Sequence, residues 1–443
     1  MTRPHVLISG ASIAGPALAF WLRRYGWQAT VVEKAPQFRT GGQNIDIRGA
    51  AREVLRRAGL EDAVRAATTG EVGTRFLGEG GAVVAEFPAG ESDTEGATAE
   101  IEILRGDLSR IFVDASTGDA STGDASTGDA SPTGDASTAD DTSTSDASTT
   151  EYVYGDSITA VDDTGDHVRV SFENGPDRTF DLVIAADGIG SSTRRLVFGA
   201  DGPSAPVIKP LGMDMTYLTL ERTPDDDDWW NWYNEPGGLA VTVRPDRHGT
   251  TRAVLTSIDY SSDRGASARR ENRRSLEEQK QHLRDQFADV GYAAPRILAA
   301  LDSTEDVYYE AIGQVHAPEW SRGRVALTGD AAWCASPVSG MGTSLSVVGA
   351  YVLAGELASH VHHRDAFAAY DRIMRPYVDQ AQKLPPGVPK VANPRTALGL
   401  RVFRYGIRAA SSPVLTKVGG KLFRPPADKI ELPDYAHLET TRA

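Results

Sequence analysis

The chain has 443 residues, a length that suits two or three domains better than one small core. Its formal net charge of -15 argues against a nucleic-acid-binding protein, which would need a basic patch. The single cysteine, Cys334, excludes an intrachain disulfide and the paired-thiol chemistry of disulfide reductases. We expect a cytoplasmic protein, because no uncharged apolar run reaches the roughly 18 residues of a membrane span and no secretory signal precedes the first predicted strand.

The first predicted elements follow a strand, helix, strand order. Residues 5–9 predict a short buried strand, and residues 16–25 predict a helix that Gly26 ends. Residues 29–33 have the Val and Thr character of a second strand. This order implies a parallel sheet, so we expect an α/β fold that begins with a Rossmann-like domain.

A low-complexity segment interrupts the next part of the chain. Helices are predicted over residues 52–67 and 104–113, with a hairpin over residues 75–84 between them. Residues 114–150 then repeat Asp-Ala-Ser-Thr-Gly and contain eight Asp but no Lys or Arg. Because the segment has no aliphatic residue larger than Ala, burial cannot offset the entropy of ordering it. We predict a disordered surface loop, and a functional tether is the alternative.

The second half of the chain is rich in predicted strands. Residues 182–186 and 325–327 predict buried strands, and residues 345–357 predict a long apolar helix. Alternating segments within residues 206–315 indicate an antiparallel sheet, which a charged helix over residues 275–287 interrupts.

Residues 10–15, Gly-Ala-Ser-Ile-Ala-Gly, form a variant of the glycine-rich turn that binds dinucleotides. Gly10 permits the sharp turn, Gly15 lets the following helix pack closely, and Ser12 replaces the usual middle glycine. The helix N-terminus favours a pyrophosphate, and Glu33, 18 residues after Gly15, is placed to accept hydrogen bonds from a ribose. The alternative is an ordinary tight turn with a solvated Glu. No second turn of this kind follows, so we do not expect a separate NAD(P)H domain.

Two further motifs accompany this turn. Residues 181–194 read Asp-Leu-Val-Ile-Ala-Ala-Asp-Gly-Ile-Gly-Ser-Ser-Thr-Arg. Residues 323–332 read Gly-Arg-Val-Ala-Leu-Thr-Gly-Asp-Ala-Ala, and Pro-Val-Ser-Gly-Met-Gly follows at 337–342. Together the three motifs resemble those of the class A flavoprotein monooxygenases, the family of para-hydroxybenzoate hydroxylase, the aromatic polyketide hydroxylases and the tetracycline-degrading monooxygenases. The resemblance implies FAD as the cofactor and NADPH or NADH as a transient reductant.

The resemblance also implies which residues bind FAD. Glu33 would hold the adenosine ribose, Arg105 the pyrophosphate or ribityl region, and Asp330 the ribityl chain. Asp187 would touch both FAD and NAD(P)H, and Arg194 would brace its loop. A turn Asp and a helix cap are the alternatives for the two aspartates. The predicted cofactor residues are Gly10, Ser12, Ile13, Ala14, Gly15, Glu33, Lys34, Arg105, Asp187, Gly188, Arg194, Gly329, Asp330, Pro337, Gly340, Met341, Gly342 and Thr343.

The start of the long apolar helix is the predicted contact with the flavin ring. Glycines within residues 340–344 let the backbone lie against a planar ring, and the helix N-terminus would stabilise negative charge at the flavin pyrimidine edge. Two positions depart from the family, since Trp333 stands where His is common and Ser344 where Asn is common. We expect Cys334 to be a small buried residue rather than a nucleophile or a flavin attachment point.

Three parts are expected: an FAD-binding domain with the parallel sheet, an α+β substrate-binding domain built on the antiparallel sheet, and a C-terminal helical tail. Basic residues on one face of the tail helix, around residues 401–408, are expected to bridge the domains rather than to contact a membrane. The expected bounds are 1–72, 101–200 and 316–384 for the FAD-binding domain, 73–100 and 201–315 for the substrate-binding domain, and 385–443 for the tail.

The substrate is expected between the FAD-binding domain and the antiparallel sheet. Arg48, the tentative catalytic residue, would meet the substrate or NAD(P)H, or form a structural ion pair. The aromatic run at residues 229–233 and the two methionines nearby either line the pocket or pack in the core. No metal site is predicted, because the nine His residues lack metal-ligand spacing. The predicted substrate residues are Gln43, Asp46, Met213, Met215, Trp230 and Trp232.

We expect a single-component enzyme that is a monomer or a homodimer. NAD(P)H would reduce FAD, O₂ would add at the flavin C4a, and the hydroperoxide would hydroxylate a small aromatic, polyketide or antibiotic-like ring, while the protein supplies orientation and a dry pocket. A Baeyer–Villiger oxygenase or halogenase of the same fold and a non-catalytic FAD-binding protein are the alternatives. The halogenase has little support, because residues 230–233 lack the Ile-Pro that should follow such a Trp-x-Trp pair.

Overall fold

The structure is a computed structural model that describes residues 3–39, 41–89, 100–118, 150–200, 205–260, 275–304, 306–385, 387–412 and 430–440. Most of the predicted loop at residues 114–150 lies outside these ranges. Its first residues contradict the prediction, because helix α4 (Arg105–Thr117) continues through them. The hydroxyls of Ser116 and Thr117 donate to the Val113 carbonyl at 2.8 and 3.2 Å, and Gly118 caps the helix in the left-handed conformation.

A six-stranded sheet forms one half of the molecule, as the predicted strand, helix, strand order implied. Its strand order is β17-β18-β11-β1-β2-β7, and all neighbours pair in parallel except β17 and β18. The strands are β1 (His5–Ser9), β2 (Gln28–Glu33), β7 (Glu151–Tyr154), β11 (Leu182–Ala185), β17 (Ser321–Arg322) and β18 (Val325–Leu327). This is the expected Rossmann-like half of an α/β fold.

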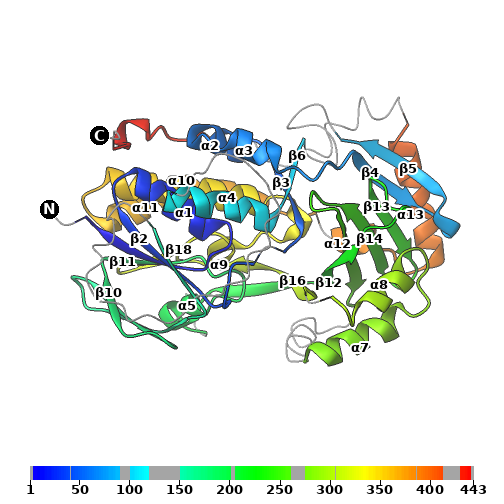
Figure 1. The fold of residues 1–443 in the computed structure, drawn as a ribbon, viewed down its shortest axis with the longest axis horizontal. Helices are drawn as coiled ribbons and strands as arrows, with labels where there is room; N and C mark the ends of the chain where they lie inside the picture. The colour runs from blue at the N-terminus through cyan, green and yellow to red at the C-terminus, as the bar shows by residue number, and fades with distance from the viewer. Residues whose placement is uncertain are drawn as a thin grey trace, which may run out of the picture.

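Both faces of this sheet are covered (Figure 1). Ile8 belongs to the core cluster with the helices on one face, whereas its neighbour Leu7 belongs to the cluster with the strands on the other. The helices are α1 (Ala14–Arg24), α4, α10 (Gly342–Ser359) and α11 (His363–Ala381). The strands are β8 (Ile158–Asp163), β9 (Val168–Phe172) and β10 (Arg178–Phe180), with helix α5 (Ser192–Phe198) beside them.

A seven-stranded sheet forms the other half, with the order β16-β12-β15-β14-β13-β4-β5. It is antiparallel as predicted, except that β13 and β4 pair in parallel. Helices α7 (Leu276–Phe287) and α8 (Ala294–Ala300) pack on one face. The strands are β4 (Gly73–Leu77), β5 (Val83–Pro88), β12 (Val207–Glu221), β13 (Trp230–Glu235), β14 (Leu239–Pro245), β15 (Thr250–Ile258) and β16 (Tyr308–His316), with the short helix η1 (Glu79–Gly81) between the first two.

Two helix predictions needed correction in the connecting region. The helix predicted over residues 52–67 is two helices, α2 (Ala50–Ala58) and α3 (Glu61–Ala66), because Gly59 ends α2 with a left-handed φ of 74°. Leu104 ends strand β6 (Ile101–Leu104), which pairs with β3 (Asn44–Ile47), so α4 begins only at the next residue.

The last part of the chain contacts both halves. Helix α13 (Ala397–Ala410) packs against β5 and β13, at the outer end of the seven-stranded sheet (Figure 1). Residues 430–440 return to the six-stranded half, where the Pro433 carbonyl accepts a hydrogen bond from Tyr351 at 2.8 Å. The tail as a whole therefore spans the two halves. The prediction that the tail helix itself bridges them was wrong, because α13 packs on the seven-stranded half. The remaining helices are α9 (Asp330–Trp333), η2 (Pro337–Ser339), α12 (Val388–Ala392) and η3 (Ala436–Leu438).

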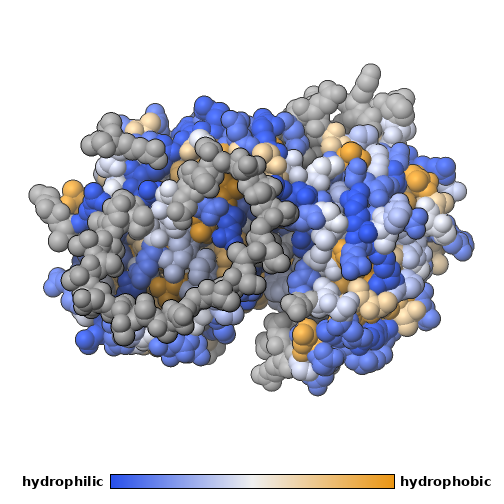
Figure 2. Space-filling model, in the orientation of Figure 1, coloured by the Kyte–Doolittle hydropathy of each residue, from blue (hydrophilic) through white to orange (hydrophobic). Residues whose placement is uncertain are grey.

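Hydrophilic residues predominate on the surface that Figure 2 shows, with hydrophobic residues scattered among them. Within the described part of the chain, every helix is too short or too polar to cross a membrane.

Candidate active site

The three sequence motifs meet through close contacts at glycines. A Cβ at Gly10 would lie 2.5 Å from the carbonyl oxygen of Ala186, and one at Gly329 would lie 2.8 Å from the Cβ of Ala14. Gly10 also has a φ of +106°, which side chains other than glycine rarely adopt. The turn after β1 therefore packs directly against the ends of β11 and β18, and the motifs converge as their resemblance implied.

A cavity of about 1180 Å³ lies between these motifs and the seven-stranded sheet. This volume exceeds the roughly 300–1000 Å³ of a pocket for one small ligand, so the cavity has room for a large cofactor and a second molecule. The predicted cofactor residues that line it are Gly10, Ser12, Ile13, Ala14, Glu33, Lys34, Arg105, Asp187, Gly188, Asp330, Pro337, Gly340, Gly342 and Thr343. Four others lie behind the cavity wall, namely Gly15, Arg194, Gly329 and Met341.

The nucleotide end of the cavity is organised around Glu33. Its two carboxylate oxygens accept hydrogen bonds from the backbone N–H groups of Ala11 and Ala35, each at 2.9 Å. The Ser109 hydroxyl holds the same turn by donating to the carbonyl oxygen of Ala11 at 3.0 Å. The N-cap of α1, Ile13, provides no side-chain cap, so the N–H groups of the first turn are left for a phosphate.

Asp187 and Arg194 fix the loop that follows β11. The Asp187 carboxylate accepts hydrogen bonds from the backbone N–H and the hydroxyl of Thr193, at 3.2 and 3.1 Å, and so holds the start of α5. Arg194 is buried and donates to the carbonyl oxygens of Ile189 and Ala331, at 2.5 and 2.7 Å. Arg194 therefore ties the loop after β11 to helix α9, which is a bracing contact of the kind expected for it.

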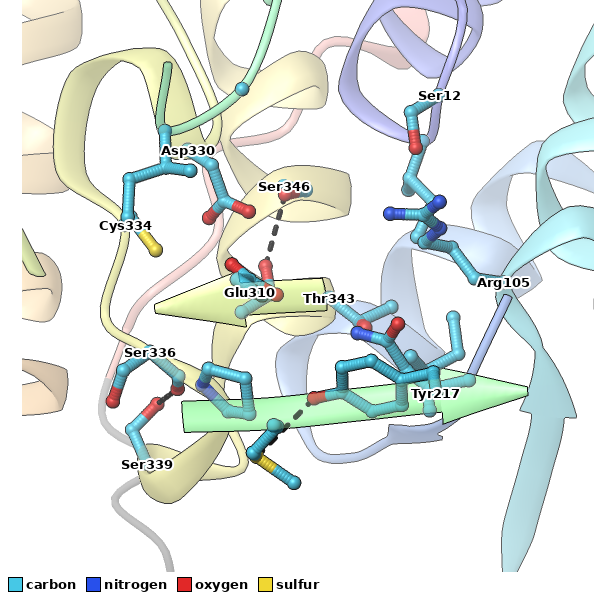
Figure 3. A pocket seen from close by; sticks show the side chains of 18 of the residues that line it. Ser12, Arg105, Tyr217, Glu310, Asp330, Cys334, Ser336, Ser339, Thr343 and Ser346 are labelled. Atoms are coloured by element: carbon cyan, nitrogen blue, oxygen red, sulfur yellow. Dashed lines mark hydrogen bonds between the residues drawn. The ribbon is translucent and has the colours of Figure 1, made fainter. Parts of the chain in front are cut away.

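Two carboxyl groups face the centre of the cavity. Asp330 begins α9, and Glu310 reaches the cavity from β16. Arg105 lies across the cavity from these two carboxyl groups (Figure 3). Asp330 lies deep in the protein, although its side chain is exposed to the cavity. The depth at which the carboxyl group lies raises its pKa, because burial disfavours the charged form. Burial, and after it the charge of Asp330, raises the pKa of Glu310 to about 7, while Arg105 lowers it.

Four glycines of the later motifs border open space. A Cβ at Gly188, Gly190, Gly340 or Gly342 would meet no atom within 4 Å, and all four positions line the cavity. The N-cap of α10, Met341, provides no side-chain cap. The backbone here can lie against a flat ligand, with a helix N-terminus beside it, as the flavin ring of FAD requires. The donor groups, carboxylates and open backbone of this wall therefore fit FAD.

The two departures from the family pattern lie outside the cavity wall. Trp333 is buried and packs against Trp320 and Tyr370, with ring centroids 4.4 and 5.7 Å away. Ser344 is also buried, and its hydroxyl donates to the Arg48 carbonyl oxygen at 3.4 Å. Cys334 is buried as predicted, and burial raises the pKa of its thiol well above the ordinary value. Trp333 is thus a core residue rather than a replacement for a cavity-lining His.

The opposite wall of the cavity is an aromatic and thioether surface. Met213 and Met215 line it from β12, and Trp230 and Trp232 line it from β13, where alternate residues of a strand share one face. Trp232 stacks on Phe76, with ring centroids 5.8 Å apart. Gln43, Asp46 and Arg48 also line the cavity, and the ion pair between Asp46 and Arg48 measures 2.9 Å.

Comparison with known proteins identifies the cofactor. A family model described as an FAD binding domain matches residues 3–383. The chain belongs to this family. The FAD-dependent monooxygenase asL4 of Sarocladium schorii is 32% identical over 467 residues, and the flavin-dependent monooxygenase eupH of Phoma sp is 31% identical over 465 residues. Each match covers 99% of both chains. Among solved structures, tetracycline destructase Tet(55) shares 30% sequence identity with this chain. The two structures superpose with a TM-score of 0.71, and the match covers 98% of this chain and 99% of that one.

These findings confirm that the protein is a flavin-dependent monooxygenase and that its cofactor is FAD. They also confirm the sequence resemblance to class A monooxygenases and the mixed α/β fold. The contacts of individual residues with FAD stay predictions, and the geometry above supplies their positions.

Sequence reasoning missed a buried charged cluster of this monooxygenase beside the aromatic wall. Arg244 lies over the ring of Trp230 at 4.6 Å and forms a 2.5 Å ion pair with Glu102. Glu71 lies 3.8 Å from the same guanidinium. Burial raises the pKa of both Glu71 and Glu102, and the charge of Arg244 lowers both. Because the guanidinium lies closer to Glu102 than to Glu71, we infer that Glu71 holds the proton and that Glu102 carries the charge.

Glu310 was missed for a related reason. None of the monooxygenase motifs includes β16. Within that strand, no Gly, Pro or Asp stands next to Glu310 to mark it as a functional residue. The signal that could have found it is a single carboxylate in the middle of an otherwise uncharged strand, where burial of a charge is costly unless a ligand or partner compensates.

Proposed function

We propose that the protein is an NAD(P)H-consuming, FAD-dependent monooxygenase that hydroxylates a small ring-containing molecule bound between its two large sheets. One observation supports this most strongly. A wall that fits FAD and a wall of Trp and Met side chains face each other across one cavity of about 1180 Å³. A reductant domain of its own is not needed for this proposal, because class A enzymes take NAD(P)H only transiently.

We further propose that the two large sheets belong to the FAD-binding and substrate-binding domains, with the bounds expected from sequence. We also propose that the motif residues bind FAD in the roles that the family resemblance implies. Glu33 and the start of α1 would bind the ribose and pyrophosphate, and Asp330 would accept hydrogen bonds from the ribityl hydroxyls. The start of α10 would place a positive partial charge beside the flavin ring. Bound FAD supplies the activation of O₂, and the protein orients the substrate and excludes water.

The proposed substrate class follows from the wall opposite these residues. Trp230, Trp232 and Phe76 offer flat aromatic surfaces, and Met213 and Met215 offer adaptable apolar ones. Such a surface favours a planar, largely apolar ring system. The similarity to Tet(55), a tetracycline destructase, adds tetracyclines to the ring compounds to test.

The test uses the purified FAD-loaded protein with NADH and with NADPH, and with panels of hydroxybenzoates, polyketides and tetracyclines. We expect at least one ring compound to raise the rate of NAD(P)H oxidation and to gain one labelled oxygen atom from ¹⁸O₂. Nuclear magnetic resonance of the product would separate ring hydroxylation from Baeyer–Villiger insertion. A protein that binds FAD but neither consumes NAD(P)H faster with any compound nor incorporates label would contradict the proposal.

A further inference from the structure

Helix α13 exposes a stripe of apolar side chains to solvent. Its inner side packs on the protein, since Leu400 is buried and the ring of Phe403 lies 6.0 Å from that of Phe76. On the outer side, three side chains recur at the helical spacing of four and three residues. This outer stripe consists of Leu398, Val402 and Tyr405, which are 71%, 64% and 76% exposed.

The same region is strongly basic. Residues 388–427 contain eight Lys and Arg and no Asp or Glu, although the whole chain has a net charge of -15. Arg401 and Arg408 are exposed and lie on one flank of the outer stripe. Arg404 instead points inward and donates to the carbonyl oxygen of Asn234 at 3.1 Å. The exposed side of α13 thus combines an apolar centre with a cationic edge.

This combination selects one kind of partner. An exposed apolar stripe on an amphipathic helix requires an apolar surface to cover it, and the cationic edge requires negative charge beside that surface. A second copy of this chain would bring two basic helices together, which is unfavourable. A bilayer with anionic lipids offers an acyl boundary and negative headgroups at once.

We propose that α13 docks the protein on an anionic lipid surface. The outer stripe enters the boundary between headgroups and acyl chains, and Arg401 and Arg408 contact the lipid headgroups. The helix has 14 residues and lies along the surface rather than across the bilayer. Basic residues of the tail thus have a partner outside the protein, in contrast to the expectation from sequence that they only bridge domains.

The docked helix adjoins the cavity. Val388, Pro389 and Ala392 of α12 line the cavity, and only the short link 393–396 separates α12 from α13. Docking would therefore place the α12 side of the cavity close to the lipid, where apolar ring compounds dissolve. This last step rests on the proposed function, whereas the docking itself does not.

Vesicle flotation of the full-length protein tests the docking without substrate or NAD(P)H. We expect binding to vesicles of phosphatidylcholine mixed with phosphatidylglycerol, and binding at least about tenfold weaker to phosphatidylcholine alone, because each basic residue at the surface gains from anionic lipid. High salt should weaken the binding. Absence of binding to the mixed vesicles would overturn the docking, even if the protein proves to be an active monooxygenase.

Variants locate the contact. The double variant Leu398→Glu, Val402→Glu should bind the mixed vesicles at least about tenfold more weakly, with unchanged FAD content and melting temperature. Val361→Glu is the matched control, because Val361 is 96% exposed in the turn between α10 and α11, away from α13, and its binding should stay unchanged. Equal binding by the double variant and the control would overturn the proposal. A dimer that the double variant loses would do the same, because a second copy would then cover the stripe.

Discussion

A Cβ at Gly15 would lie 1.9 Å from the carbonyl oxygen of Gly10. The backbone of the first helical turn therefore touches the backbone of the turn that precedes it, with no room for a side chain. The same close approach brings Gly10 against the end of β11. A substitution at residue 15 consequently displaces the nucleotide end of the cavity, although Gly15 does not line the cavity itself.

Gly15→Ala should lose FAD and stability together. The added methyl group must displace the Gly10 backbone, which costs about 1–3 kcal/mol in a packed core and disturbs the phosphate-binding turn. The ratio of flavin absorbance to protein absorbance and the free energy of unfolding measure the two effects. Gly406→Ala in α13 is the control, since a Cβ there meets no atom within 4 Å and should leave stability equal or up to about 1 kcal/mol higher. Normal FAD content in Gly15→Ala would refute this reading of the turn.

Glu310 should make stability depend on pH. Its folded pKa of about 7 lies above the ordinary value of 4.5, so the folded state holds the proton more tightly than the unfolded state. Stability from this group is full at low pH and falls as pH rises from about 4.5 to about 7, by no more than about 3 kcal/mol.

Comparison with Glu310→Gln isolates this contribution, because glutamine does not titrate. We expect the difference in unfolding free energy, wild type minus variant, to decrease across that pH range in FAD-free protein. The exposed Glu221→Gln is the control for a change of carboxylate elsewhere on the sheet. A difference that stays constant would show that folding does not raise the pKa of Glu310, and one that increases with pH would show that folding lowers it.

Glu71 and Glu102 should respond differently to the same substitution. Glu102→Gln removes the partner of the buried Arg244 guanidinium and should cost about 3–5 kcal/mol of stability. Glu71→Gln replaces a neutral acid with a neutral amide and should cost much less. Denaturant unfolding of the two variants at pH 7 makes each one the control for the other. Equal losses would mean that Glu71 carries a charge.

Trp232→Ala should weaken substrate binding without loss of FAD. The indole stacks on Phe76 in the wall opposite the FAD motifs, and removal of this half-buried aromatic surface is expected to raise KM about tenfold or more. Steady-state kinetics with the substrate identified by the oxidation assay measure KM, and absorbance measures FAD content. Tyr233→Phe is the neighbouring control, because Tyr233 faces the core on the other side of β13. An unchanged KM would place the substrate away from this wall.

The elements predicted best from sequence are those fixed by local pattern. The strand at residues 5–9 and the helix α10 follow from continuous apolar runs, and the turn that Gly10 opens follows from glycine placement. The boundary at Gly59 was missed although its signal is local, because Gly59 follows the basic Arg56 and Arg57 and ends α2 in the left-handed conformation. From sequence, the aromatic residues at 229–233 could line the pocket or pack in the core. The structure shows both, because neighbouring residues of a strand point to opposite faces, so that Trp232 faces the cavity and Tyr233 faces the core.

The missed residues share a different property. Glu310, Arg244 and Glu102 act through neighbours that are far away in sequence, such as Asp330 for Glu310 and strand β6 for Arg244. Their environment exists only once two sheets face each other, and no local spacing encodes that. Motifs revealed the cofactor wall because its chemistry sits in short contiguous turns, whereas the opposite wall is assembled from single residues of several strands.

A crystal structure of the protein with FAD bound would show directly where the cofactor lies. We predict FAD in the cavity between the two large sheets, with its pyrophosphate at the start of α1, and with Glu33 and Asp330 within hydrogen-bonding distance of the ribose and ribityl hydroxyls. FAD bound elsewhere, or in the cavity without contact to either carboxylate, would contradict the account.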